Sequence, residues 1–174
     1  MRIMTKKINF KITIEETAER HPVPVLGTDY KVKIIYKNIK VAQLDVVDKI
    51  IKISLPNKYK KANNEKILDI AIDKMYEQIA KVEVERAMEK TRILLGFAPE
   101  DYEIKKIKSS FGKCEDNKIT INPEIVKYGR NIIDYVVLHQ YCHLKYKTHS
   151  KGFMNMLKEY EPKFEQYEEK LIKY

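Results

Sequence analysis

His139-Gln140-Tyr141-Cys142-His143 is the most informative stretch of this sequence of 174 residues. Two histidines four residues apart on a helix project from the same face, one turn apart, and their imidazoles can bind one metal ion together. A third histidine, His149, follows six residues later. On a continuous helix it would lie off that face and roughly 9 Å further along the axis. We therefore expect the helix to end first, and a turn near 147–148 to return His149 to the metal.

Three histidine ligands leave the fourth position of a zinc ion open to water, as in catalytic rather than closed structural sites. We expect one Zn²⁺ per chain, bound by His139, His143 and His149. Three histidines and a water also suit cobalt or nickel, so the sequence leaves the identity of the metal open.

Gln140 occupies the position at which the zinc-protease motif His-Glu-x-x-His has a glutamate. In that motif the glutamate accepts a proton from the metal-activated water. Glutamine forms hydrogen bonds but cannot take up a proton at neutral pH. General-base catalysis is worth about 10²- to 10⁴-fold, so we expect metal binding to be kept and peptidase activity to be reduced by at least that order.

Other side chains near the histidines give a less specific signal. Helical geometry turns Cys142 away from the metal face, which predicts a small buried core residue. Tyr141, Tyr146 and Tyr160 could each donate a hydrogen bond to substrate or to a transition-state oxyanion. The sequence does not choose among them, and core packing is the alternative for each.

Hydrophobic periodicity around this stretch predicts an α+β fold. Apolar and polar residues alternate, as in half-buried strands, in the following segments: 6–14, 30–36, 39–44 and 50–55. We expect the last three to form an antiparallel meander with turns at Asn38 and Asp48-Lys49. Residues 1–62 would then form an N-terminal β-rich lobe.

Helices dominate the expected second part, residues 63–174, which we expect to pack with the first part as one compact unit. Spacing of 3.6 residues predicts a long helix over 64–95 with an apolar stripe at Leu68, Ala71, Ile72, Met75, Ile79 and Val82.

A hairpin is expected after the long helix, with strands over 102–109 and at Ile119 and Ile121, and a turn at 115–117. Asn131 is the expected N-cap of the histidine helix. Ser150 is the expected N-cap of a further helix through Tyr160, and Pro162 can open a last one.

The net charge of +9, from 34 Lys and Arg against 25 Asp and Glu, favours anionic partners such as nucleic acid or acidic proteins. The lysines are spread along the chain, so a solvated surface is the simpler interpretation. Two cysteines are too few for a disulfide framework, and no run approaches the ~18 apolar residues that span a bilayer. We expect a soluble cytoplasmic protein with no membrane partner.

Several segments around the histidines carry a resemblance to a known family: Ser109-Ser110-Phe111-Gly112-Lys113-Cys114, 118–122, 134–144 and His149-Ser150-x-x-Phe153. There the chain resembles the YgjP-like metallopeptidase domain, a relative of the SprT-like and WLM zinc proteases. The resemblance implies a zincin-like fold, Zn²⁺ on the three histidines, a general base at position 140, and a hairpin edge where an extended peptide binds by strand addition. Members usually have Ser-Arg-Trp-Gly-Ser-Cys in the first segment, from which this chain departs at Ser110, Phe111 and Lys113.

The favoured function is therefore a zinc-dependent peptidase acting on a peptide or protein substrate through a metal-activated water, with its base missing in this chain. Because all three histidines are present, we favour an engineered glutamate-to-glutamine change at Gln140, with a natural pseudoenzyme as the alternative. Two other functions stay open: a catalytically silent zinc-binding module for nucleic acid or acidic proteins, and a metal-dependent nucleotide phosphohydrolase. The second lacks support from any Gly-rich phosphate loop.

Overall fold

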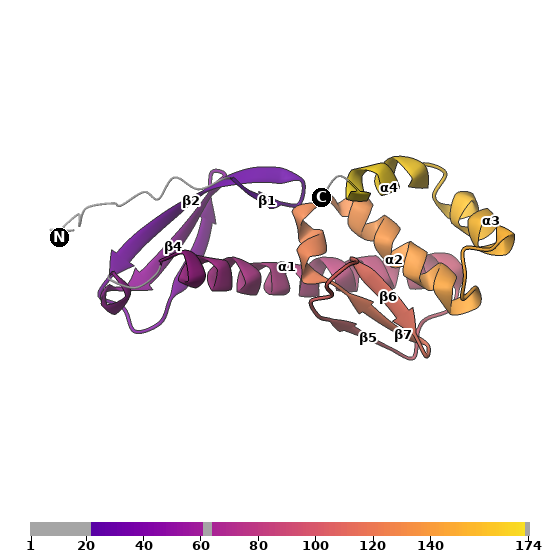
Figure 1. The fold of residues 1–174 in the computed structure, drawn as a ribbon, viewed down its shortest axis with the longest axis horizontal. Coiled ribbons are helices and arrows are strands. Elements are labelled where there is room, and N and C mark those ends of the chain that lie inside the picture. The colour runs from indigo at the N-terminus through magenta and orange to yellow at the C-terminus, as the bar shows by residue number, and fades with distance from the viewer. Residues whose placement is uncertain (1–21, 61–63, 173–174) are drawn as a thin grey trace, which may run out of the picture.

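The computed structural model describes residues 22–60 and 64–172, so the strand expected at 6–14 lies outside the described residues. The molecule is elongated, with a four-stranded sheet at one end and a three-stranded sheet with helices α2 to α4 at the other (Figure 1). A long helix, α1 (Asn64–Leu95), runs from one end to the other. Buried residues from both ends form one continuous core.

The first sheet has the strand order β1-β2-β4-β3, formed by Val23–Val25, Thr28–Lys37, Ile50–Pro56 and Gln43–Val47 respectively. The expected antiparallel meander is wrong, because β2 and β4 pair in parallel and β3 lies on the far side of β4. Strand β4 carries the buried residues Ile51, Ile53 and Leu55, whereas every residue of β3 is exposed. The most apolar strand therefore takes the central position and the least buried one an edge.

Two tight turns organise this sheet. The predicted turn at Asp48-Lys49 is confirmed, and both residues have positive φ (50° and 60°), as a two-residue hairpin turn requires. A second turn, at Leu26-Gly27, joins β1 to β2. Its tip reaches the other half of the molecule, where the Leu26 amide donates to the carbonyl of Val126 in a 3₁₀ helix, η2 (Pro123–Lys127), at 2.7 Å.

Helix α1 has the predicted bounds, and it ends where Gly96 adopts a φ of +75° and donates its amide to the Arg92 carbonyl. The predicted apolar stripe is wrong at Val82, which is 67% exposed. Past Met75 the buried side of α1 moves to Ala80, Val84 and Ala87, because α1 there packs against α2 and η2 instead of the first sheet.

The second sheet has the order β5-β7-β6, formed by Asp101–Ile104, Lys118–Ile121 and Gly112–Glu115. The predicted turn is confirmed at Asp116-Asn117, which both have positive φ. The first predicted hairpin strand is wrong, since β5 ends at Ile104 and pairs in parallel with β7. The antiparallel partner of β7 is β6, an edge strand that the alternation of apolar residues did not reveal.

Three helices complete the fold: α2 (Arg130–Lys145), α3 (Lys151–Tyr160) and α4 (Phe164–Ile172). Ser150 caps α3 as predicted, with its hydroxyl accepting from the Phe153 amide, whereas the N-cap of α2 is Gly129 and not Asn131. The predicted α+β class, with N-terminal strands, a long helix and C-terminal helices, is confirmed. Among the described helices, none is both long and apolar enough to cross a membrane.

Ion pairs fix α2 against α1. Arg130 binds the buried carboxylate of Glu83 through two nitrogens, with its Nη2 2.7 Å from Oε1. Arg86 donates to Glu83 at 3.0 Å and to Asp134 at 2.6 Å. Lys90 donates to the second oxygen of Asp134 at 2.6 Å. This alternating row of charges places the helix that carries the first two histidines at a defined position along α1.

Candidate metal centre

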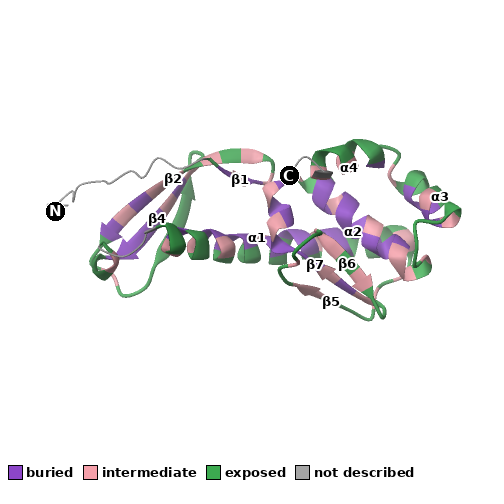
Figure 2. Ribbon diagram, in the orientation of Figure 1, coloured by how far each residue is buried: buried purple, intermediate pink, exposed green. Residues whose placement is uncertain are grey.

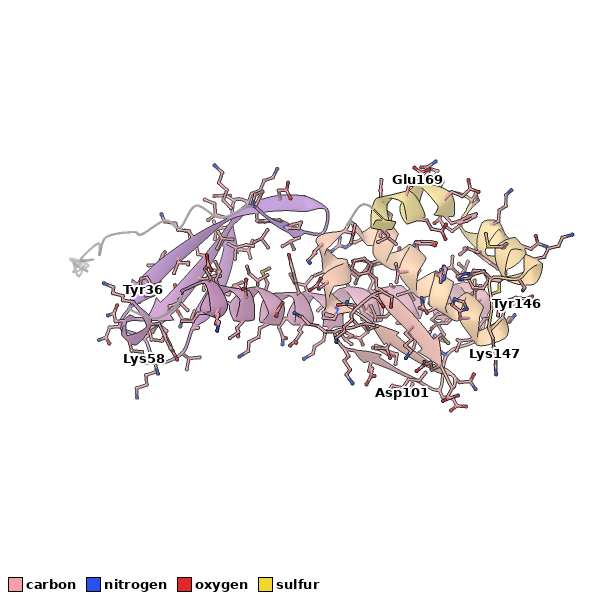
Figure 3. All side chains as sticks on the ribbon, in the orientation of Figure 1. Tyr36, Lys58, Asp101, Tyr146, Lys147 and Glu169 are labelled. Carbon is pink, nitrogen blue, oxygen red and sulfur yellow. The ribbon has the colours of Figure 1, made fainter. Side chains whose placement is uncertain are left out.

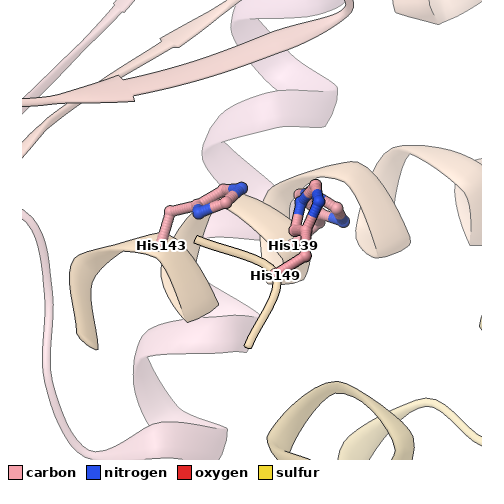
Figure 4. Close-up of side chains that lie close together, drawn as sticks. All are labelled: His139, His143 and His149. Carbon is pink, nitrogen blue, oxygen red and sulfur yellow. The ribbon is translucent and has the colours of Figure 1, made fainter. Parts of the chain in front are cut away.

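The structure brings His139, His143 and His149 together at the end of α2 (Figure 4). Helix α2 ends at Lys145, before His149, as the sequence predicted. The loop between α2 and α3 then returns the third imidazole, so that its Nε2 lies 3.1 Å from the Nε2 of His139. One nitrogen from each ring lies within 4.8 Å of the others.

A backbone hydrogen bond fixes the tautomer of His143. Its Nδ1 lies 3.0 Å from the carbonyl oxygen of Tyr146, which only accepts hydrogen bonds. Nδ1 must therefore carry the proton, and the lone pair of Nε2 is free. Tyr146 lies just past the end of α2 (Figure 3), where its ring packs so closely on Gly152 that a Cβ there would approach its Cε1 to 2.6 Å.

His139 has a side-chain partner instead. Its Nδ1 lies 3.2 Å from the hydroxyl of Tyr135, one turn earlier on α2. The same hydroxyl lies 2.7 Å from Oε1 of Glu168 on α4. Burial and the Glu168 carboxylate raise the pKa of Tyr135 well above its ordinary value, so the hydroxyl stays protonated.

Burial keeps the imidazoles of His139 and His143 neutral. Burial, followed by the neighbouring His143 and His149, lowers the pKa of His139 to about 3. Burial also lowers the pKa of His143, although the hydrogen bond to the Tyr146 carbonyl opposes the shift. Neutral imidazole is the form that binds a metal ion, so these rings are ready to act as ligands at pH 7.

Phe153 forms an apolar floor beneath the three rings. It is fully buried, and its ring centroid lies 5.0 Å from that of His139, 4.7 Å from that of His143 and 4.6 Å from that of His149. Its position on the first turn of α3 places it directly after the loop that carries His149. One side chain therefore supports all three candidate ligands.

The donor set fits a tetrahedral metal ion. Two zinc–nitrogen bonds of about 2.0–2.1 Å at the tetrahedral angle separate their nitrogens by about 3.4 Å, close to the 3.1 Å between the Nε2 atoms of His139 and His149. Three imidazole nitrogens, with Nδ1 of His139 and of His143 hydrogen-bonded elsewhere, are the arrangement expected of zinc ligands. His149 is exposed, which leaves one side open to solvent.

Gln140 is buried beside the edge strand β6. A Cβ added to Gly112 would lie 2.7 Å from its Nε2, so only glycine lets the strand approach this side chain. A cavity of about 310 Å³ opens here, next to His139 and Gln140. Its walls come from β6, α2 and α4, and they include the apolar side chains of Phe111, Val136 and Leu171.

The three tyrosines considered as substrate contacts lie in different places. Tyr141 is buried, and its hydroxyl donates to the Met88 carbonyl on α1 at 3.1 Å, which fits the alternative of core packing. Tyr146 is half-buried beside His143, whereas Tyr160 is exposed at the end of α3. Cys142 is fully buried, as predicted, and burial raises the pKa of its thiol to about 11.

Sequence reasoning missed four residues of this site: Tyr135, Glu168, Phe153 and Gly112. Tyr135 had a usable signal, because it lies four residues before His139 and thus on the same helix face. Gly112 and Phe153 lie in the segments that resemble the YgjP-like family, but no role in the site was predicted for either residue. Glu168 had no signal, because it approaches the site through the packing of α4 on α2.

Comparison with known families identifies the class to which the chain belongs. A model of the YgjP-like metallopeptidase domain matches residues 2–174. A metal-dependent peptidase is thus the class of protein that the fold and site indicate. The chain belongs to the YgjP-like metallopeptidase domain family. No protein of curated function matches it.

Solved structures with similar folds include two metallopeptidase zymogens. Abylysin from Pyrococcus abyssi is 23% identical, with a TM-score of 0.48, over 52% of this chain and 92% of that chain. Jannalysin from Methanocaldococcus jannaschii is 22% identical, with a TM-score of 0.47, over 52% of this chain and 88% of that chain. At this level of similarity neither likeness bears on the function of this chain.

Proposed function

We propose that this chain is a zinc metallopeptidase domain whose general base is missing. One Zn²⁺ per chain would be held by His139, His143 and His149. The observation that carries the proposal is the convergence of three imidazoles, two of them with Nδ1 engaged by other groups, on one point beside a cavity. When bound, the metal would supply Lewis acidity that activates a water and polarises a carbonyl group.

The peptide substrate would lie along β6, whose second edge is unpaired among the described strands. An extended peptide adds to such an edge through main-chain hydrogen bonds. Its side chain next to the scissile bond would enter the cavity lined by Phe111, Val136 and Leu171. The resulting geometry would hold the scissile carbonyl between the edge strand and the histidines.

Gln140 would orient the attacking water without accepting its proton. Its side chain packs on Gly112 and lines the cavity, at the position where a glutamate would act as the base. Glutamate and glutamine have nearly the same shape, so the replacement preserves the packing on Gly112 while it removes the proton acceptor. Because the surrounding histidines and their hydrogen bonds are intact, we propose that Gln140 stands in place of an original glutamate through an engineered change.

The test is to measure zinc content by mass spectrometry and peptidase activity before and after Gln140→Glu. We expect about one zinc per chain in both forms, and an increase in kcat of about 10²- to 10⁴-fold in the variant. Gln43→Glu is the matched control, because it makes the same chemical change at an exposed position on β3. It should leave activity at the parent level.

The alternatives give different outcomes in the same experiment. Bound zinc without peptidase activity in the Gln140→Glu variant, over a broad peptide panel, would contradict the peptidase and favour a silent binding module for nucleic acid or acidic proteins. Release of phosphate from nucleotides by that variant would identify a phosphohydrolase. A chain that binds no metal would overturn the proposal entirely.

A further inference from the structure

The last described helix contributes a carboxylate to the surroundings of the candidate metal centre. Glu168 on α4 lies 2.7 Å from the hydroxyl of Tyr135, and that hydroxyl lies 3.2 Å from Nδ1 of His139. Glu168 also lines the cavity beside His139. These three side chains thus form a continuous row from α4 to a candidate ligand on α2.

The direction of the hydrogen bonds in this row follows from the groups themselves. A phenol has one proton to donate, and an ionised carboxylate can only accept. The Tyr135 hydroxyl therefore donates to Glu168 and has only its lone pairs to offer His139. His139 must donate from Nδ1, which leaves its Nε2 unprotonated towards His149, the side on which a metal would bind.

Packing holds each member of the row in place. Tyr135 is 3% exposed. Its ring lies 5.8 Å from that of Tyr167, the residue before Glu168, and 5.8 Å from that of His139. Phe164, one turn earlier on α4, is buried in the core. The carboxylate of Glu168 is therefore held against the hydroxyl by the docking of α4.

We propose that Tyr135 and Glu168 are positioning residues for the metal, which orient His139 and strengthen its Nε2 as a ligand. The proposal rests on the metal centre proposed above. A negative carboxylate polarises the phenol, the phenol oxygen becomes a better acceptor for the Nδ1 proton, and the imidazole gains electron density at Nε2. Docking of α4 thereby contributes to the affinity for metal without α4 supplying a ligand.

The experiment measures zinc affinity of the full chain by competition with a chromophoric chelator. We expect Tyr135→Phe and Glu168→Ala each to weaken zinc binding by about 10- to 100-fold. Glu168→Gln, which keeps an uncharged acceptor, should lose less than Glu168→Ala. Glu169→Ala is the matched control, because that neighbouring carboxylate points away from the molecule into solvent, and zinc affinity should stay at the parent value (Figure 3).

A double variant separates positioning from general damage to the fold. If Glu168 acts through Tyr135, then Glu168→Ala should have almost no further effect in the Tyr135→Phe background. Equal losses in both backgrounds would overturn the proposal, because a merely structural role does not require the hydroxyl. The d–d absorption bands of the Co²⁺-loaded protein should shift in both single variants and stay unchanged in the control.

The possible failures are distinguishable. If the parent chain binds zinc and the Tyr135→Phe and Glu168→Ala variants bind it equally well, the proposed role of Tyr135 and Glu168 is wrong. The proposed metal centre is then unaffected. A parent chain that binds no zinc overturns the metal centre and the row with it.

Discussion

The two ends of α1 differ in what their packing accomplishes. In the first sheet, β4 is largely buried (Figure 2) whereas β3 is exposed, so that Val46 is 50% exposed although it pairs with the fully buried Ile51. At the other end, α1 packs against α2, in which both Tyr135 and Val137 are buried. None of the described residues of the first sheet reaches the histidines. The sheet contributes to folding, whereas the helical end combines folding with the chemistry of the site.

This difference implies that a substitution in the first sheet can lower stability without changing metal binding. A substitution at Phe153, beneath the histidines, should change both. Substitutions at the two ends should therefore give contrasting results.

Phe153→Ala should have the largest effect. Truncating a fully buried phenylalanine costs about 3–5 kcal/mol of unfolding free energy, and here it also removes the ring that supports all three histidines. We expect weaker zinc binding in the molecules that remain folded. Urea denaturation of the metal-free protein measures the first effect, and chelator competition measures the second.

Ile53→Ala is the matched change at the sheet end. Ile53 is 1% exposed on β4, so truncation should cost about 2–5 kcal/mol. Zinc affinity of the folded protein should stay within about twofold of the parent, because distant sites act independently. Equal loss of zinc affinity in both variants would contradict the contrast between the two ends.

Acidification should weaken the ion pairs of Glu83 that connect α1 to α2. Hydrogen bonds from Arg130, aided by Arg86, hold the pKa of Glu83 below its ordinary value, although burial opposes the shift. A carboxyl with a lowered folded-state pKa contributes stability that is present above its unfolded pKa, near 4.3, and is lost as the pH falls through its folded pKa. The unfolding free energy should therefore decline below about pH 4–5.

Glu83→Gln should remove this part of the pH dependence. At pH 7 it should lower the unfolding free energy by about 1.5–3 kcal/mol, the range for hydrogen bonds to charged groups, and the exposure of Arg130 favours the low end. Denaturation curves between pH 7 and pH 3 provide the measurement, with the exposed Glu85→Gln as the control. Identical pH profiles for Glu83→Gln and the parent would contradict the assignment.

The sequence predicted the part of the site that depends on local spacing. Helix geometry alone placed His139 and His143 on one face, and the position of His149 required the helix to end before it, as it does at Lys145. Glu168 could not be predicted, because it meets Tyr135 only after α4 has packed on α2. Contacts between helices depend on packing angles that periodicity does not encode.

Strand pairing shows the same limit in the fold. Alternating residues identified much of β2 and β4 and the turn at Asp48-Lys49, but period two specifies the faces of a strand and not its neighbours. Alternation therefore could not show that β4 would lie between β2 and β3 and pair in parallel with β2. The edge strand β6 lacks alternating apolar residues, because it is paired on one side only and borders the site.

Val46→Lys should have the smallest effect. Val46 and Ile51 lie opposite each other on the same face of the sheet, yet only Ile51 is covered. A lysine at an exposed position usually changes stability by less than about 0.5 kcal/mol, whereas Ile51→Lys would bury an ammonium group and should prevent folding. Denaturation at several protein concentrations tests this contrast. A loss above about 1 kcal/mol for Val46→Lys that grows with concentration would mean that β3 is covered by a second copy of the chain, and the sheet end would then have an interface of its own.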